Sequence, residues 1–220
     1  MDILWSGAVL VPVITLCATM PPKELDPRGI AGWIALAALV HRYSGSSETA
    51  LDQDLRACRA PDPLRSLLSN LRQHRADLEA RPEDFEGALV DRSGLLAMYF
   101  ACRQRGILDF YTGGKVLLQD SIDRHHILPR AQFPEKLRPK SDCVANVAFI
   151  SGGVNKSIGL TGPEVYLRRI NGRILASQCI PVDRELWAVD NAEGFWAARR
   201  QLLAEAFNDY VHRALPHRRL

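Results

Sequence analysis

The chain has 220 residues, 47% of them hydrophobic and 24% charged, with a formal net charge of +3. These values are typical of a soluble globular protein of one domain or two small ones, whose core needs no disulfide or metal to stabilise it. The five cysteines are odd in number and widely spaced, without a CxxC pair, which argues against a disulfide framework and a cysteine-built zinc site.

A nearly apolar segment, residues 3–20, opens the chain. It lacks the basic start of a signal peptide, because Asp2 is acidic and the first basic residue is Lys23. It is also interrupted by polar residues and by Pro12, so we expect a buried helix or strand-helix segment and no membrane span. Because the chain starts inside apolar sequence, we expect it to be a fragment of a longer protein.

The first 106 residues are predicted to form a helical subdomain. Helical spacing of apolar residues predicts helices over 29–43 and 48–59. Asp62 as N-cap and Pro63 at the first helical position predict the start of a third helix. Its apolar stripe is Leu64, Leu67, Leu68, Leu71 and Leu78. Another helix opens at Ser93 and ends at Gly106, a natural C-terminal stop.

Residues 107–220 are predicted to form the second subdomain. Residues 107–118 have a Gly-Gly pair between short apolar runs, which predicts a turn between extended pieces. A last helix is expected over 193–214, with Asp190 and Glu193 resembling a capping box. Its apolar side consists of Trp196, Leu203, Phe207 and Tyr210.

Between these elements lies the stretch that carries chemistry, residues 122–159. A strand is expected over 122–128, stopped by Pro129, and a second short strand over 146–151. The intervening loop is rich in Pro, Lys and Arg. A helical stretch is expected from Asn155 through Ile170, interrupted near Gly162-Pro163. The overall expectation is therefore an α+β fold, mostly helical, with one strand-loop-strand-helix unit.

The residue types in this unit suit phosphodiester hydrolysis. A histidine, which ordinarily titrates near ~6.5, can take a proton from the attacking water, and we assign this role to His126. A divalent cation can neutralise the phosphoryl oxygens and the leaving oxygen, with His125 and Asn155 as its ligands. Such ligands suit Mg²⁺ best, while the imidazole makes Mn²⁺ or Ni²⁺ credible. Asn146 is expected to hold the loop and orient His126.

Two further basic residues, Arg130 and Lys156, are candidate contacts to DNA phosphates, as opposed to ordinary solvated surface charges.

The stretch resembles the ββα-metal (HNH) nuclease superfamily and, more closely, the C-terminal nuclease domain of GmrSD-like bacterial defence proteins. The resemblance rests on His125-His126-Ile127-Leu128-Pro129, on Asn146-Val147-Ala148-Phe149-Ile150, and on Asn155 followed by Pro163 and Tyr166. Weaker similarities are Trp33 with Arg42-Tyr43-Ser44, Asp109-Phe110 with Gly113, and Phe195 with Arg199-Arg200. The family often has Asp or Glu where this chain has His125, and Asp123, two residues earlier, is a possible additional metal ligand.

The resemblance implies a metal-dependent endonuclease of low sequence specificity that nicks double-stranded DNA. It also implies a role in anti-phage defence or restriction of modified DNA in the bacterial cytoplasm, with phosphorothioate-sensing nucleases among the family members. The N-terminal nucleotidase or sensor domain of such proteins has no counterpart in this chain. Two alternatives remain open: a DNA-binding or regulatory module with an inactive HNH fold, and a structural domain stabilised by a metal.

Overall fold

The computed structural model of the protein describes residues 4–116, 122–152, 158–159 and 161–216. It is an α+β fold with one small sheet, as predicted. The helices and strands, in chain order, are α1 (Leu10–Thr19), α2 (Pro27–Leu39), α3 (Ser47–Ala57), α4 (Pro63–Arg72), α5 (Arg92–Gln104), β1 (Ile122–His126), α6 (Arg138–Ser141), β2 (Val147–Ser151), α8 (Pro163–Tyr166), α9 (Gly172–Ser177) and α10 (Ala192–Ala214).

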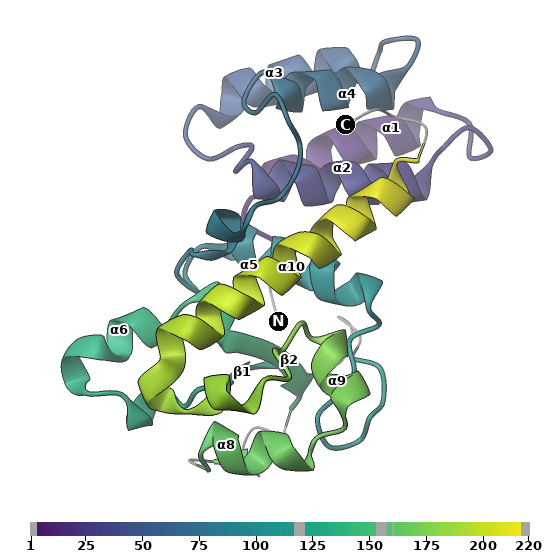
Figure 1. Ribbon diagram of the computed structural model, residues 1–220. Coiled ribbons are helices and arrows are strands. Elements are labelled where there is room, and N and C mark those ends of the chain that lie inside the picture. Colours follow the sequence, from purple (N-terminus) through teal and green to yellow (C-terminus); the bar gives the residue numbers. More distant parts are fainter. Residues whose placement is uncertain (1–3, 117–121, 153–157, 160, 217–220) are drawn as a thin grey trace.

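Helices α1–α4 form one end of the molecule, and the two strands with α6, α8 and α9 form the other (Figure 1). The last helix, α10, runs between the two ends alongside α5. Its 23 residues make it about 35 Å long at 1.5 Å per residue. The helix thus belongs to both halves of the fold. Its first half packs near the strands, and Leu203, Phe207 and Val211 belong to the core of the helical end.

Helix α4 starts where its predicted side-chain cap places it. The carboxylate of Asp62 accepts from the backbone N–H of Arg65 at 3.1 Å, and Pro63 is the first helical residue of α4. Helix α5 begins at Arg92, one residue before the expected Ser93, with Asp91 as its cap, and it ends before Gly106, whose φ of +77° suits glycine. The predicted capping box of α10 is wrong, because the helix begins after Asn191 without a side-chain cap.

The prediction for residues 29–43 was correct in type but not in its bounds. Helix α2 starts at Pro27, capped by Asp26, and ends at Leu39. The chain then turns through His41 and Tyr43, which both have positive φ. This conformation is held by Arg42, which is 1% exposed and makes a bidentate ion pair with Asp54.

Residues 3–20 are helical over most of their described length, with a short 3-10 turn before α1. Only one side of α1 is buried, through Pro12 and Leu16, while Ile14 is 64% exposed. The expectation of a buried segment therefore holds for one face of α1 only. Among the described residues, no helix is both long enough and apolar enough to cross a bilayer.

Strands β1 and β2 pair antiparallel, and alternate residues on β2 face different cores. Val147 and Phe149 join the core of the helical end, whereas Ala148 and Ile150 join a second core built around Phe110, Tyr166 and Trp196. In the register, His126 lies opposite Val147 and His125 lies opposite Ala148. The two histidines therefore point to opposite sides of the sheet.

The segment between the strands differs from the long loop that was expected. It contains 3-10 turns at Arg130–Gln132, Glu135–Leu137 and Val144–Asn146 as well as α6. The first strand also ends at His126, two residues earlier than expected, and the next residue, Ile127, donates its N–H to the carbonyl of Asn146, which lies in a 3-10 turn. The turn expected within residues 107–118 is confirmed for the described part, 107–116, by an antiparallel bridge between Leu108 and Lys115.

Candidate functional site

Asn146 joins the two ends of the segment between the strands. Its side-chain oxygen accepts from the backbone N–H of Leu128 at 3.0 Å. Its amide nitrogen donates to the carbonyls of Leu128 (3.0 Å) and Ser141 (2.9 Å). The side chain is fully buried, so all three bonds are shielded from water. The chain leaving β1 is thereby held against the chain entering β2, an arrangement that the predicted role of Asn146 requires.

His126 is the last residue of β1 and borders an open hollow of about 550 Å³. Its side chain is 29% exposed, and its Nε2 lies 3.0 Å from Oδ1 of Asp142. An ionised carboxylate can only accept, so a neutral His126 carries its proton on Nε2 and its lone pair on Nδ1. The other residues lining the hollow are Leu89, Val90, Arg92 and Arg124.

Asp142 was missed in the sequence because nothing in the local pattern distinguishes it from other surface acids. Its position depends on residues far away in the chain. The N–H of Leu89 donates to the carbonyl of Asp142 at 2.9 Å, and Ala88 forms an antiparallel bridge with Cys143. The other carboxylate oxygen of Asp142 accepts from Nε of Arg130 at 3.0 Å. Asp142 therefore links a predicted base to a predicted phosphate contact.

His125 lies on the other side of the sheet and is 3% exposed. Its Nε2 is 3.1 Å from the hydroxyl of Tyr166, which itself donates to the carbonyl of Ile127 at 2.8 Å. Burial raises the pKa of Tyr166 well above its ordinary value, so the phenol stays protonated. Because the phenolic proton goes to Ile127, the hydroxyl accepts from His125, and a neutral His125 has its lone pair on Nδ1. Such orientation by a neighbour is common for metal-binding histidines.

The remaining predicted site residues divide into two groups. Asp123 is half-buried on the same side of β1 as His125 and lies opposite Ile150. Arg130 is half-exposed beside Asp142. Asn155 and Lys156 lie outside the described residues, so their predicted roles stay predictions.

Metal ligands are only partly represented in the described residues. Among those residues, no group of three or more His, Cys, Asp or Glu side chains could hold a metal ion. The predicted ligand pair needs one imidazole and one amide oxygen, and only the imidazole, His125, belongs to the described part of the chain. Its tautomer fits a metal ligand, because Nδ1 carries the lone pair when the ring is neutral.

Two buried side chains from distant segments support β2. Gln178 accepts from the N–H of Phe149 at 2.9 Å and donates to the carbonyls of Phe149 and of Leu108. It therefore stands in for a third strand at the open edge of the sheet. Arg199 of α10, fully buried, donates to the carbonyls of Ala145 (2.9 Å) and Gln178 (3.1 Å). These contacts fix the start of β2 against α10.

Asp109 fixes the end of β2. One carboxylate oxygen accepts from the backbone N–H groups of Tyr111 (3.0 Å) and Thr112 (2.9 Å), and the other from that of Ser151 (2.8 Å). Burial by itself raises the pKa of Asp109, but the bonds from Thr112, Ser151 and Tyr111 outweigh it, and the net pKa is lowered. Asp109 thus connects the 107–116 turn to the strand that precedes the predicted ligand Asn155.

This lowered pKa predicts a pH-dependent effect of Asp109→Asn. A carboxyl group with a depressed folded-state pKa stabilises the fold above its unfolded pKa of ~3.9, and this stabilisation is lost as pH falls through the folded-state pKa. We expect the variant to lower the free energy of unfolding by about 1–2 kcal/mol at pH 7, because an amide cannot accept all these bonds. The deficit relative to wild type should shrink below about pH 4.

Urea unfolding at pH 7, 5 and 3.5 measures this difference, with Asp209→Asn on the exposed side of α10 as the matched control. The control should change little at any pH. If Asp109→Asn lowers the free energy of unfolding by the same amount at all three pH values, the lowered pKa of Asp109 does not contribute to stability as predicted.

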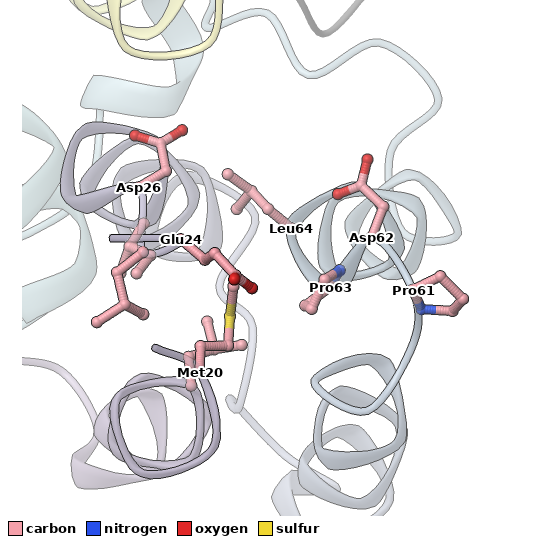
Figure 2. Close-up of a pocket in the computed structure, with 10 residues that line it drawn as sticks. Met20, Glu24, Asp26, Pro61, Asp62, Pro63 and Leu64 are labelled. Atoms are coloured by element: carbon pink, nitrogen blue, oxygen red, sulfur yellow. The ribbon is translucent and has the colours of Figure 1, made fainter. Parts of the chain in front are cut away.

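A separate pocket of about 270 Å³ lies where the end of α1 meets the starts of α2 and α4 (Figure 2). Glu24, Asp26 and Asp62 make it acidic over an apolar floor that includes Met20 and Leu64. Asp26 and Asp62 are the N-caps of α2 and α4. Helix capping therefore accounts for two of the three carboxylates, and the pocket is no part of the candidate site.

Comparison with protein-family models, curated proteins and solved structures finds no match to this chain.

Proposed function

We propose that the chain is a metal-dependent DNA endonuclease of the HNH type. The observation that carries the proposal is the triple hydrogen bonding of Asn146, which holds the two ends of the inter-strand segment together. With the segment held in this way, His126 lies at the end of β1, beside the carboxylate of Asp142 and a hollow large enough for a phosphodiester. The sequence resemblance assigns the same roles to His126 and Asn146.

In the proposed reaction, a water oxygen bonds to phosphorus while Nδ1 of His126 takes a proton from that water molecule. The bond between phosphorus and the 3′-oxygen breaks, and that oxygen leaves with a proton from solvent. Asp142 holds the ring through Nε2–H and stabilises the imidazolium that forms. Arg124, which lines the same hollow, and Arg130, which pairs with Asp142, supply positive charge for the phosphate oxygens.

A divalent metal would supply neutralisation of the growing charge on the phosphoryl and leaving oxygens. His125 and Asn155 are the proposed ligands, with Asp123 as a possible third and Mg²⁺ as the metal that such ligands suit best, ahead of Mn²⁺ or Ni²⁺. The position of Ile158 supports placing the metal on the His125 side of the sheet. Ile158, which follows Asn155 in sequence, is buried in the same core as the Phe110 and Tyr166 rings that enclose His125.

The substrate we propose is double-stranded DNA, nicked with little sequence preference, because the candidate groups at the hollow read phosphates and not base edges. Lys156 joins Arg130 as a proposed phosphate contact. A cytoplasmic role in bacterial defence, including restriction of modified or phosphorothioate DNA with a separate sensor domain, is proposed on the resemblance alone.

The proposal is tested with supercoiled plasmid incubated with Mg²⁺, Mn²⁺ or chelator. Wild type should convert it to open circles only when metal is present. Absence of conversion with every metal would favour a DNA-binding module with an inactive site. A large fall in melting temperature on chelation would instead indicate a structural metal.

Asp142→Asn tests the contact that distinguishes this site. We expect the nicking rate at saturating DNA to fall about 10–100-fold, because an amide neither holds the ring in one tautomer nor stabilises the imidazolium. The apparent KM and the melting temperature should stay close to wild type. Glu135→Gln, an exposed acid on the same inter-strand segment, is the matched control. Equal rates in the two variants would remove Asp142 from the proposed mechanism.

A further inference from the structure

A second hollow, of about 430 Å³, lies at the opposite end of α10 from the strands. Residues from three helix ends line it. They are Pro27, Arg28 and Ala31 of α2, Arg103 and Gln104 of α5, and Tyr210, Arg213 and Ala214 of α10. Three arginines distant in sequence therefore converge on one concavity, and none of the described residues that line it is acidic.

The approach of α10 to α2 that creates this hollow depends on Gly32. A Cβ atom at Gly32 would meet that of Ala214 at 2.9 Å, closer than real contacts allow. Tyr210 fixes α10 against α5, since its ring lies 5.0 Å from that of Phe100. The concavity is therefore built by close packing of three helices and is not a gap between loose side chains.

The charge of the arginines is not balanced by carboxylates within the described part of the chain. Arg213 donates to Oε1 of Gln104, in the amide orientation that presents this oxygen, at 3.1 and 2.8 Å. A neutral amide holds the guanidinium in place without cancelling its charge. Arg28 and Arg103 are exposed, and the described residues provide neither with an ion pair.

Helix dipoles explain two of these arginines but not the third. Arg103 and Arg213 lie in the last turns of α5 and α10, where a positive charge is favourable. Arg28 lies in the first turn of α2, where the N–H groups already concentrate positive charge and a basic residue is unfavourable. An anion bound between them would compensate Arg28 and use all three guanidinium groups.

We propose that this hollow binds a small phosphorylated anion, of the size of pyrophosphate or a nucleoside diphosphate. Guanidinium groups bind phosphate oxygens through paired N–H donors, and the volume lies within the range of small-ligand sites. The concave shape fits a compact ligand better than a duplex, whose phosphates lie along an extended line. Tyr210 adds a hydroxyl donor, since burial raises its pKa and keeps it protonated.

This site is independent of the proposed nuclease. Arg213 lies about 21 Å along α10 from Arg199, which contacts the start of β2. Each site can therefore be present without the other.

The test titrates pyrophosphate and ADP into the full chain by calorimetry, and follows the melting temperature, at constant ionic strength. Wild type should bind both saturably, with a rise in melting temperature. Arg28→Gln and Arg103→Gln should each weaken binding about tenfold or more, because a charged hydrogen-bond donor is lost. Tighter binding of ADP than of pyrophosphate would mean that the adenine ring of ADP also contributes to binding. Equal binding would mean that the phosphate groups alone are recognised. Both results support the site.

Arg65→Gln is the matched control, because Arg65 is also exposed in the first turn of a helix that starts with proline, yet does not line this hollow. It should bind as wild type does. Without ligand, Arg28→Gln should melt at the wild-type temperature or higher, which separates binding from folding. The proposal is overturned if wild type binds neither pyrophosphate nor ADP. It is also overturned if Arg28→Gln and Arg103→Gln both bind these probes as tightly as wild type does, or if only duplex DNA binds and loses affinity in these variants.

Discussion

His126→Ala should reduce metal-dependent plasmid nicking by about 10²–10⁴-fold while leaving affinity for duplex DNA unchanged. The physical reason is that His126 is the one imidazole at the open hollow among the described residues, with Nδ1 as its proton acceptor and Nε2 held by Asp142. Removing the ring takes away the base without altering Arg124 or Arg130, which provide charge for binding. Nicking of supercoiled plasmid measures the rate, and a gel-shift titration without metal measures binding.

The matched control for this experiment is His212→Ala, which removes an exposed histidine from α10. It should nick DNA at the wild-type rate. If His126→Ala keeps its activity, the base lies elsewhere and the proposed mechanism fails. If both binding and cleavage disappear in His126→Ala while the fold is intact, His126 contributes to DNA affinity and is not simply the base.

Asn146→Ala should lower the free energy of unfolding by about 3–5 kcal/mol. The substitution leaves three buried backbone groups without partners, namely the N–H and carbonyl of Leu128 and the carbonyl of Ser141. Each unsatisfied buried group costs about 1–3 kcal/mol, although partial relaxation of the chain reduces the total. Urea unfolding, monitored by circular dichroism, measures the shift in midpoint.

Asn191→Ala provides the comparison, because Asn191 is exposed and its side chain makes a single hydrogen bond, to the carbonyl of Glu185 at 3.2 Å. Its effect should stay below about 1 kcal/mol. An Asn146→Ala protein as stable as this control would mean that the inter-strand segment does not depend on the Asn146 bonds. The proposed positioning of His126 would then lose its structural basis.

Local sequence patterns predicted most helices because their signals lie within a few residues of one another. Asp62 and Pro63 begin α4, and Gly106 follows α5, since capping and positive φ are properties of short segments. The end of α2 was misplaced because its cause is remote. Arg42 lies beyond the end of α2 and bonds to Asp54, which belongs to α3.

The candidate site shows the same division. The order of residues in the strand-loop-strand unit was enough to propose His126 and Asn146 as candidates, and the Asn146 side chain bonds to Leu128 and to Ser141, at the two ends of the inter-strand segment. Asp142 was not identified, because its position depends on pairing of residues 142–144 with residues 87–89. The local sequence around Asp142 does not predict that pairing.

Sequence by itself therefore predicted most of the helices and the strand pair, and it nominated His126 and Asn146 as candidate site residues, because caps, periodicity and adjacent motifs act over a few positions. Tertiary structure alone decided which side of the sheet each histidine faces, which acid meets His126, and that Arg28, Arg103 and Arg213 share one hollow. The reason is physical: contacts between distant segments depend on how whole helices pack, and that packing is a property of many side chains together.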